Sequence, residues 1–587
     1  MSEQQKRPFT YEVTPETGIV AYFSMEIAID PKLPTYSGGL GVLAGDTLRS
    51  AADLGVPMVA FTLAHRQGYF QQHLDPNGNQ SEQSQPWNPA DTLPELSVRT
   101  TLAIEDRIVT VRAWRYDVQG RYGHVVPIFL LDTDLEENSA WDRGLTDHLY
   151  GGDSNYRLQQ EIVLGMGGAR ILNAMGLNAN VYHMNEGHAA LLTLALLESE
   201  LGGGPEFPIS NTDIAAVQQK CVFTTHTPVP AGHDRFSLEQ TIRILGGERT
   251  ARLEKLGCIV DGTLNMTTLA LRFSRYANGV ALKHGEVSRQ MFPKDKIDSI
   301  TNGVHAPTWL SEPMQNLFDA HMPAWRRDNL YLRNAIEIPE AEVLAAHAQA
   351  KEALLSEIAT LTGKALSPNV LTLGFARRAA TYKRADLLFT DPERLAAMAQ
   401  SAGGLQIVYG GKAHPQDQPG KTIIRKVIET AAKLSIDTLR IVYLENYNWE
   451  LGALMTAGVD VWVNNPRRPY EASGTSGMKA ALNGVPSLSI LDGWWIEGCI
   501  EGVTGWAIED GEDDIAEAFS LYRKLESSII PLYRSGMQHW AQLMKTTIAF
   551  NGSFFNTNRM VKQYTRNAYY PVRLLKNVDV REAAYTA

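Results

Sequence analysis

Cysteine is scarce in this sequence: the 587 residues include three, Cys221, Cys258 and Cys499. Thiols so far apart cannot build a disulfide framework or a cysteine-based zinc site, so we expect reduced thiols and a cytoplasmic protein. Long apolar segments are missing too. No run approaches the roughly 20 residues that span a bilayer, and residues 1–8 lack the apolar core of a secretory signal. The sequence therefore predicts no membrane partner.

Positive charge is in deficit, since 54 Lys and Arg residues face 65 Asp and Glu residues and leave a net charge of −11 at pH 7. This balance argues against nucleic acid and anionic membranes as partners. An anionic ligand must therefore be bound by a local group of cations. The apolar share of 44% and the charged share of 20% are those of an ordinary globular protein. The length suits two or more large domains.

Apolar strand-like runs alternate with helical patterns along most of the chain, which is typical of open α/β sheets. A helix is predicted at 43–54, and strands are predicted at 18–23, 57–62, 220–225, 370–375, 405–409, 439–443 and 459–463. The last four leave room for a helix between each pair, so residues 370–508 form a sheet of their own. The sequence predicts two doubly wound, Rossmann-like α/β domains facing across a cleft, with ligands at the carboxyl ends of the strands.

A helical segment separates the two α/β regions. Residues 332–362 are rich in Ala, Glu, Leu and Lys and have a helical pattern. We therefore predict four segments, the last of which is expected to pack back on the first. They are an N-terminal α/β domain at 1–315, a helical connection at 316–365, a C-terminal α/β domain at 366–545 and a closing segment at 546–587.

The most informative motif is residues 471–479, which read EASGTSGMK between a strand-like run and a helix-like run at 478–482. Gly474 and Gly477 let backbone amides point at a common centre, and the helix start adds positive potential there. Lys479 is predicted in the first turn of this helix, where an amine has a lowered pKa and can react with an aldehyde. A phosphate cradle beside a reactive lysine indicates a pyridoxal-phosphate site.

These nine residues allow a second interpretation and exclude a third. A strand–turn–helix junction with an exposed lysine has the same pattern, because a lone glycine-rich loop is a weak signal. A Walker A loop is excluded, since the spacing from Gly474 to Lys479 is wrong and no Ser or Thr follows the lysine.

A cluster of four cations follows the predicted strand 370–375: Arg377, Arg378, Lys383 and Arg384. In an acidic protein, such a cluster at the end of a strand favours an anion site. Arg offers a fork of donors to a phosphate, and Lys offers a compact charge. A solvated basic turn is the alternative.

Three further loops carry groups that can bind a sugar or a phosphate. Residues 35–43 offer glycine amides, residues 223–233 offer His226 or His233, and residues 300–304 offer Asn302. A structural role is the ordinary alternative for a lone histidine. Residues 183–188 contain two histidines but no third ligand at a familiar spacing, so no metal site is predicted.

Two anion sites and several hydroxyl-binding groups in one cleft suit two kinds of enzyme. One holds a pyridoxal phosphate opposite a second phosphate, and the other is a nucleotide-sugar transferase, whose diphosphate needs the same cations. Lys479 favours the first, because a nucleotide-sugar enzyme has no use for an aldehyde-reactive lysine.

Several motifs together resemble the glycogen, starch and maltodextrin (α-glucan) phosphorylase family over most of the chain. They are residues 22–26 (YFSME), 37–41 (SGGLG), 300–303 (ITNG), 382–384 (YKR), 444–447 (LENY), 471–484 (EASGTSGMKAALNG) and 558–564 (NRMVKQY). The resemblance implies a two-domain clamp of the GT-B glycosyltransferase type, with glucan bound by the first domain and pyridoxal phosphate by the second. It also implies a homodimer.

The implied activity is reversible phosphorolysis of α-1,4-glucans, maltodextrin or glycogen, from the non-reducing end. Orthophosphate is consumed, and α-D-glucose 1-phosphate is released with retention at the anomeric carbon. In this family the 5′-phosphate of the cofactor passes a proton to or from the substrate phosphate. The substrate phosphate then protonates the leaving glycosidic oxygen.

The resemblance also implies roles for individual residues. Lys479 resembles the lysine that carries the cofactor as a Schiff base, and it is grouped with Arg378, Lys383 and His226 as catalytic. The cofactor phosphate is matched to Thr475, Ser476, Arg377 and Gly39, and the substrate phosphate to Arg378 and Lys383. The glucosyl and acceptor contacts are matched to His226, Asn302, Glu471, Ser473, Gly474, Gly38, Leu40, Asp153 and Glu186.

The sequence departs from the family at several positions. Arg377 stands where Lys is usual, Ala380 where His is usual, and Glu186 where Asp is usual. Residues 149–156 resemble the mobile gate of the active site but are shortened, with Asp153 as the gate acid. Because the chain starts near the first sheet, we expect a compact, unregulated enzyme that prefers maltodextrins.

Two alternative functions remain at this point. A nucleotide-sugar-dependent glucosyltransferase would share the clamp but would need no cofactor on Lys479. A non-catalytic glucan-binding protein would leave Lys479, Arg378 and Lys383 idle.

Overall fold

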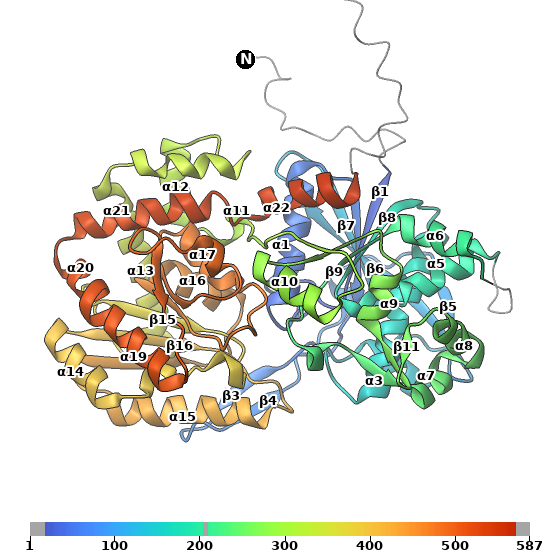
Figure 1. The fold of residues 1–587 in the computed structure, drawn as a ribbon, viewed down its shortest axis with the longest axis horizontal. Helices are drawn as coiled ribbons and strands as arrows, with labels where there is room; N and C mark the ends of the chain where they lie inside the picture. Colours follow the sequence, from blue (N-terminus) through green and yellow to red (C-terminus); the bar gives the residue numbers. More distant parts are fainter. Residues whose placement is uncertain (1–17, 203–208, 571–587) are drawn as a thin grey trace, which may run out of the picture.

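The computed structural model describes residues 18–202 and 209–570. The outer ends of the predicted segments 1–315 and 546–587, at residues 1–17 and 571–587, lie outside the described residues, as do residues 203–208. Figure 1 shows two halves side by side, each built around a sheet with helices on its faces.

The first half contains a nine-stranded sheet of order β14-β13-β9-β8-β1-β2-β7-β6-β5. Its strands are β1 (Ile19–Ser24), β2 (Met58–Leu63), β5 (Thr100–Ile104), β6 (Arg107–Gln119), β7 (Val125–Asp132), β8 (Ala179–Asn185), β9 (Cys221–Thr224), β13 (Tyr276–Gly279) and β14 (Ile297–Ser299). The strands from β14 to β7 pair in parallel, whereas β6 is antiparallel to both β7 and β5. The repeat of strand and helix does not predict this edge, because β5, β6 and β7 follow one another without a helix between them.

The second half contains a six-stranded, fully parallel sheet of order β17-β16-β15-β18-β19-β20. Its strands are β15 (Thr372–Ala376), β16 (Leu405–Gly410), β17 (Leu439–Leu444), β18 (Val461–Asn464), β19 (Ser487–Ile490) and β20 (Gly505–Ile508). The strand order reverses between β15 and β18, so the loops that follow these two strands lie next to each other at a topological switch point. The predicted α/β fold with two wound sheets is confirmed.

Helices cover both sheets (Figure 1). Those of the first half are α1 (Gly39–Leu54), α2 (Ala140–Arg143), α3 (Ser154–Ile162), α4 (Gly168–Ala174), α5 (Leu192–Glu200), α6 (Asn211–Lys220), α7 (Leu238–Leu245), α8 (Gly247–Lys255), α9 (Met266–Arg272) and α10 (Leu282–Met291). Those that follow are α11 (Ala306–Trp309), α12 (Glu312–His321), α13 (Glu340–Thr362), α14 (Pro392–Ala402), α15 (Gln418–Leu434), α16 (Trp449–Gly458), α17 (Thr475–Leu482), α18 (Trp495–Gly498), α19 (Asp514–Lys524), α20 (Ile530–Arg534), α21 (Met537–Thr547) and α22 (Thr557–Tyr564). Among the described helices, none has both the length and the apolar character that crossing a bilayer demands.

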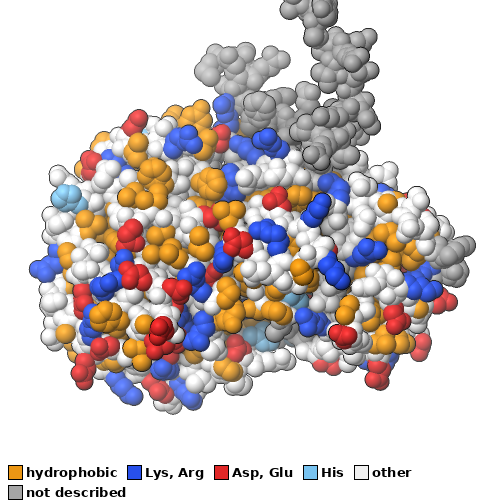
Figure 2. Space-filling model, in the orientation of Figure 1, with side chains coloured by type: hydrophobic (Ala, Val, Ile, Leu, Met, Phe, Trp, Pro, Cys, Tyr) orange, Lys and Arg blue, Asp and Glu red, His pale blue; other side chains and the backbone are white. Residues whose placement is uncertain are grey.

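Small antiparallel elements complete the fold. They are the hairpin of β3 (Gln71–Leu74) and β4 (Gln80–Gln83), and a small sheet of β10 (Arg235–Ser237), β12 (Thr263–Asn265) and β11 (Ile259–Val260). On the face shown in Figure 2, Lys and Arg side chains are interspersed with Asp and Glu side chains. Charge on this face is therefore mixed, in keeping with a neutral rather than a polyanionic partner.

Helical segments lie where the chain passes from one half to the other. The 3₁₀ segment Asn329–Glu337 and α13 occupy the region predicted to be helical, and α13 packs against α16 and α21. After α21 the chain returns to the first half, where α22 packs on α1. Met560 and Tyr564 of α22 join Leu48 of α1 in one buried core. The end of the described chain therefore fastens the two halves together.

Candidate active site

Cations gather where the loops after β15 and β18 meet. Lys383 Nζ donates to Glu471 Oε2 at 2.6 Å, and Arg377 Nη2 donates to the same oxygen. Burial by itself would raise the pKa of Glu471, but Arg377 and Lys383 lower it to about 2. The carboxylate is therefore charged and balances part of the charge of its two partners.

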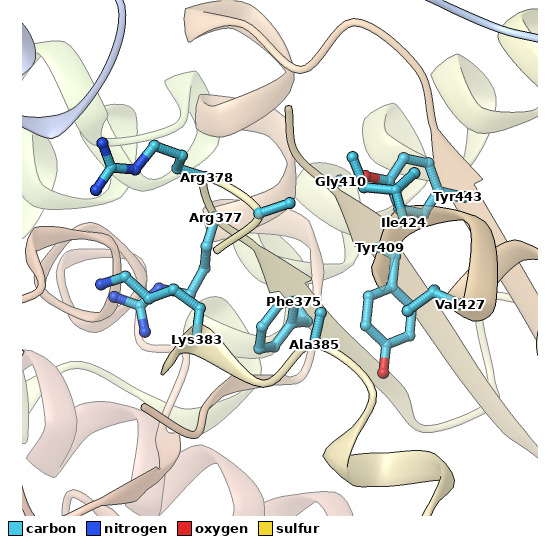
Figure 3. Close-up of a pocket in the computed structure, with 11 residues that line it drawn as sticks. Phe375, Arg377, Arg378, Lys383, Ala385, Tyr409, Gly410, Ile424, Val427 and Tyr443 are labelled. Carbon is cyan, nitrogen blue, oxygen red and sulfur yellow. The ribbon is translucent and has the colours of Figure 1, made fainter. Parts of the chain in front are cut away.

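Arg378 lies differently from its neighbour. Figure 3 shows the side chains of Arg377 and Lys383 running side by side, while that of Arg378 extends away from them. The Arg378 side chain is exposed, and it forms no ion pair with a described carboxylate. Its guanidinium interacts with Tyr382 but is not neutralised by a described carboxylate, so its charge is available to an anion.

Arg384, the fourth predicted cation, does not belong to this group. It is 4% exposed, donates to the carbonyls of Asn465 and Pro466 at 3.0 and 2.9 Å, and pairs with Asp514 of α19 at 2.8 Å. Its donors are thus used to hold the chain after β18. The prediction of a cluster of four cations is wrong for Arg384, because the sequence does not show toward which side each cation points.

Lys479 lies in the second turn of α17, not in the first turn as predicted, because the helix already begins at Thr475. Its Nζ lies 3.4 Å from the centre of the Trp309 ring, and no described carboxylate forms an ion pair with it. Burial lowers the pKa of Lys479 to about 8, against the opposite influence of Asp46. The predicted direction of the shift is right, but its cause is burial and not the helix terminus.

The start of α17 provides unpaired backbone amides. Gly474 precedes the helix with a φ of 86°, which favours glycine, and no side chain caps the terminus. Thr475 and Ser476 form the first turn, and Ser476 Oγ accepts from Trp462 Nε1 at 3.1 Å. This terminus is suited to an anion close to Lys479.

The glycine loop of the first half also offers open space at a helix start. A Cβ added at Gly38 or Gly39 would meet no atom within 4 Å, and no side chain caps α1. Glu26 Oε2 fixes the loop by accepting from the amide of Gly38 at 3.1 Å and from Ser37. The amides of Gly39 and Leu40 therefore border space that a ligand can enter.

Two of the buried polar atoms that lack a partner among the described residues belong to predicted sugar-binding residues. They are Asn302 Oδ1 and Ser473 Oγ, in residues that are 3% and 4% exposed. Because buried polar atoms are almost always hydrogen-bonded, these two fit contacts with hydroxyl groups of a ligand.

His226 is held by its neighbours in the first half. Its Nε2 lies 2.7 Å from Asn185 Oδ1, and its backbone amide donates to Glu186 Oε2 at 2.7 Å. Burial lowers the pKa of His226 to about 4, although Glu186 acts in the opposite direction. The imidazole is therefore neutral near pH 7, with its Nε2 proton directed at Asn185.

Glu186 supports this loop through its carboxylate. It also accepts from Thr227 Oγ1 at 2.9 Å and from the amide of Gly187, and its own backbone has a φ of 77°. Burial alone would raise the pKa of Glu186, but His226, His233 and His188 lower it. A contact between Glu186 and the acceptor stays a prediction.

Asp153 is exposed at the start of α3, where it accepts from the amide of Tyr156 at 2.9 Å. The structure thus gives it a helix-capping role. Its role as a gate acid stays a prediction.

The sequence did not single out four supporting residues. Asn185 orients His226, Trp309 covers Lys479, Asp46 accepts from Trp309 Nε1 at 2.7 Å, and Asp492 accepts from the amide of Glu471 at 3.0 Å. None has a sequence pattern of its own. Within the described ranges, no group of His, Cys, Asp and Glu side chains could hold a metal ion.

A family profile described as carbohydrate phosphorylase matches residues 224–504. The maltodextrin phosphorylase of Thermococcus litoralis is 40% identical, over 94% of this chain and 70% of its own length. The glycogen phosphorylase of Mycobacterium tuberculosis H37Rv is 38% identical over 97% and 74%, and that of Aquifex aeolicus is 35% identical over 95% and 87%.

Proposed function

This chain belongs to the carbohydrate phosphorylase family, and we propose how its cleft performs the reversible, anomer-retaining phosphorolysis of an α-1,4-glucan to α-D-glucose 1-phosphate. It is a glycosyltransferase of the α-glucan phosphorylase kind, with the GT-B arrangement of two wound sheets. The relatives do not favour the alternatives of a nucleotide-sugar glucosyltransferase or a non-catalytic binding protein.

The buried amine of Lys479 carries the proposal that the cofactor is pyridoxal 5′-phosphate. With a pKa of about 8, Lys479 keeps an appreciable uncharged fraction near neutral pH and can attack an aldehyde. The amides of Thr475 and Ser476, the open space at Gly39 and the cation Arg377 would hold the phosphate of the cofactor. When bound, the cofactor supplies a phosphate whose second pKa near ~6 suits proton exchange with the substrate phosphate.

Orthophosphate would bind to Arg378 and Lys383. The guanidinium of Arg378, which has no carboxylate partner among the described residues, can bind two phosphate oxygens, and Lys383 can add a point charge from the side of Glu471. Two phosphates close together repel each other, and these cations would offset that repulsion. They would also hold the attacking oxygen near the anomeric carbon, which lowers the barrier by orientation.

The glucosyl residue would bind between the two halves. Asn302 Oδ1 would accept from a hydroxyl, and Ser473 Oγ would donate to or accept from one. Neutral His226 would add an uncharged partner, and Glu471 with Gly474 would complete the contacts. Gly38 and Leu40 would line the same space from the glycine loop, with Asp153 and Glu186 toward the acceptor. We propose maltodextrin as the preferred glucan.

We also propose the division into segments 1–315, 316–365, 366–545 and 546–587, a cytoplasmic location and a homodimer. The connection of α13 to the second half and the return of α22 to the first support the last two of the three inner boundaries. Light scattering of the purified protein tests the dimer.

Borohydride reduction followed by peptide mapping tests the proposed function. Protein reconstituted with pyridoxal phosphate should carry the reduced adduct on Lys479 and release glucose 1-phosphate from maltoheptaose in a phosphate-dependent reaction. Lys412 is the internal control, because burial lowers its pKa to about 8 as well, yet it lies outside the site. An adduct on Lys412 but not on Lys479 would contradict the proposed cofactor site.

A further inference from the structure

The β3–β4 hairpin leaves the first half and lies beside α15 of the second half (Figure 1). Gln72 is fully buried at this contact. Its amide N–H donates to Asn446 Oδ1 at 3.1 Å, its Oε1 accepts from the amide of Asn446 at 2.9 Å, and its Nε2 donates to the carbonyl of Gly411 at 3.0 Å. The side chain of Gln72 is therefore used to bind the other half.

Gln80 on the opposite strand of the hairpin repeats this pattern. Its Nε2 donates to the carbonyl of Ala413 at 2.8 Å, and its Oε1 accepts from the amide of Ala413 at 3.0 Å. Gln72 Nε2 also donates to Gln80 Oε1 at 2.9 Å. The two glutamines thus form one unit that binds both ends of the short segment Gly411–Ala413.

That segment in turn supports the backbone around Arg378. The amide of Ala379 donates to the carbonyl of Lys412 at 2.8 Å, and Ala379 and Ala413 form a parallel bridge. At Gly411, with a φ of 148°, an added Cβ would lie 2.0 Å from the carbonyl oxygen of Arg377. The segment therefore touches the residues on both sides of Arg378.

Apolar packing reinforces the same contact. Leu74 and Ile428 pack against a small core of Ala379, Ala413 and Ile424. Lys421 of α15 forms an ion pair with Glu82 of the hairpin at 2.6 Å. The hairpin thus packs against the loop after β15, which carries Arg377, Arg378 and Lys383.

Arg378 depends on this support more than its neighbours do. Arg377 and Lys383 are fixed through Glu471, whereas the exposed side chain of Arg378 has no such carboxylate among the described residues. Apart from an interaction of its side chain with Tyr382, the position of Arg378 depends on its backbone, and residues 411–413 hold that backbone.

We propose that the β3–β4 hairpin is a positioning element for phosphate binding, in which Gln72 and Gln80 of the first half hold Arg378 of the second half in place. The inference rests on the proposed function, in which Arg378 binds orthophosphate. It predicts that breaking the contact weakens the binding of phosphate and leaves the glucan contacts and the cofactor unchanged.

Gln80→Met tests this inference, because it keeps the side-chain length and removes both bonds to Ala413. We expect the KM for orthophosphate, and that for glucose 1-phosphate in the reverse direction, to rise about tenfold. The KM for maltoheptaose and the cofactor content should stay within about twofold. His73→Ala is the matched control, since His73 lies on the same hairpin and makes an exposed contact to Glu445 of the second half at 3.4 Å.

Binding of inorganic phosphate, measured by calorimetry on the holoenzyme, tests the hairpin without turnover. Gln80→Met should bind phosphate about tenfold more weakly than the wild type and His73→Ala. Equal phosphate affinities in all three proteins, or a KM for maltoheptaose that rises as much as the KM for orthophosphate, would overturn the inference. Gln72→Glu, which keeps the acceptor for Asn446, provides a second variant if the first unfolds. Absence of phosphorolysis in the wild type would instead contradict the proposed function.

Discussion

Beside the second sheet, two of three neighbouring cations share one carboxylate, whereas beside the first sheet one carboxylate, Glu186, lies among histidines. Glu471 serves Arg377 and Lys383, which leaves Arg378 in excess. Burial lowers the pKa of His226 to about 4, so the other side contributes neutral imidazole instead of positive charge. An acidic chain thus concentrates its anion-binding cations in one loop and leaves the other side for a neutral, hydroxyl-rich ligand.

The two sides also differ in how they are assembled. The cations come from one loop, at the point where the strand order reverses. The histidine side combines Asn185 at the end of β8, His226 after β9 and Asn302 after β14, and His226 bonds to both Asn185 and Glu186. Parallel strands bring these separate loops to one edge of the sheet. The cation side can therefore be predicted from one stretch of sequence. The sequence offers the residues of the histidine side only as separate candidates.

Removal of Lys479 should have the largest effect. Lys479→Ala is expected to lower phosphorolysis by at least about 10³-fold, because no other amine lies at the start of α17 to bind the cofactor. Lys412→Ala, which removes a lysine of similarly lowered pKa, should retain the cofactor. For both variants, the absorbance of the cofactor measures cofactor content, and the release of glucose 1-phosphate measures activity. Full activity in Lys479→Ala would contradict the proposal that Lys479 carries the cofactor.

Arg378 should come next. Arg378→Ala is expected to lower kcat by about 10²–10³-fold while the cofactor stays bound, because a cation that stabilises the transferring phosphate is lost. Arg467→Ala is the control, since Arg467 is an exposed cation of the same half, paired with Asp514 at 2.7 Å. Loss of the cofactor from Arg378→Ala would indicate that Arg378 binds the phosphate of the cofactor and not the substrate phosphate, which would contradict its proposed role.

The two sides should also be separable by pH. The pKa of Glu471 is lowered from 4.5 to about 2, so its contribution to stability is present above pH 4.5 and lost toward pH 2. The shift corresponds to about 3 kcal/mol. The pKa of His226 is lowered from 6.5 to about 4, so the unfolded chain takes up its proton first and stability falls from pH 6.5 to 4.

Urea unfolding between pH 7 and pH 3 measures both contributions. His226→Asn should flatten the loss of stability between pH 6.5 and 4. Glu471→Gln should be less stable than the wild type at pH 7, with a difference that shrinks below pH 4.5. Parallel curves for the wild type and Glu471→Gln would show that the carboxylate does not carry its charge against the two cations.

The smallest effect is expected at Asp153. Asp153→Ala should lower the free energy of unfolding by about 1 kcal/mol through loss of the α3 cap, whereas Asp153→Asn keeps the cap. Steady-state kinetics of Asp153→Asn then isolates the predicted gate role. A normal KM for glucan in Asp153→Asn would leave Asp153 as a helix cap without a part in the gate.

Much of the second half could be predicted from the sequence. The strands predicted at 370–375, 405–409, 439–443 and 459–463 correspond to β15, β16, β17 and β18, because buried parallel strands are continuous apolar runs. The antiparallel edge of the first sheet was not predicted. Its strand β6 alternates buried and exposed residues and follows no helix, so it does not fit the repeat of strand and helix.

At the site, the sequence determined which chemical groups are present and in what local order. Glycines next to a helix start, a lysine within it and cations after a strand are local features, and local backbone chemistry follows from neighbouring residues. Tertiary structure decided their properties. Burial, not the helix end, lowers the pKa of Lys479, and packing turned Arg384 away from its three neighbours. Gln72 meets Gly411 across the two halves, because burial and contact depend on residues that are distant in the chain.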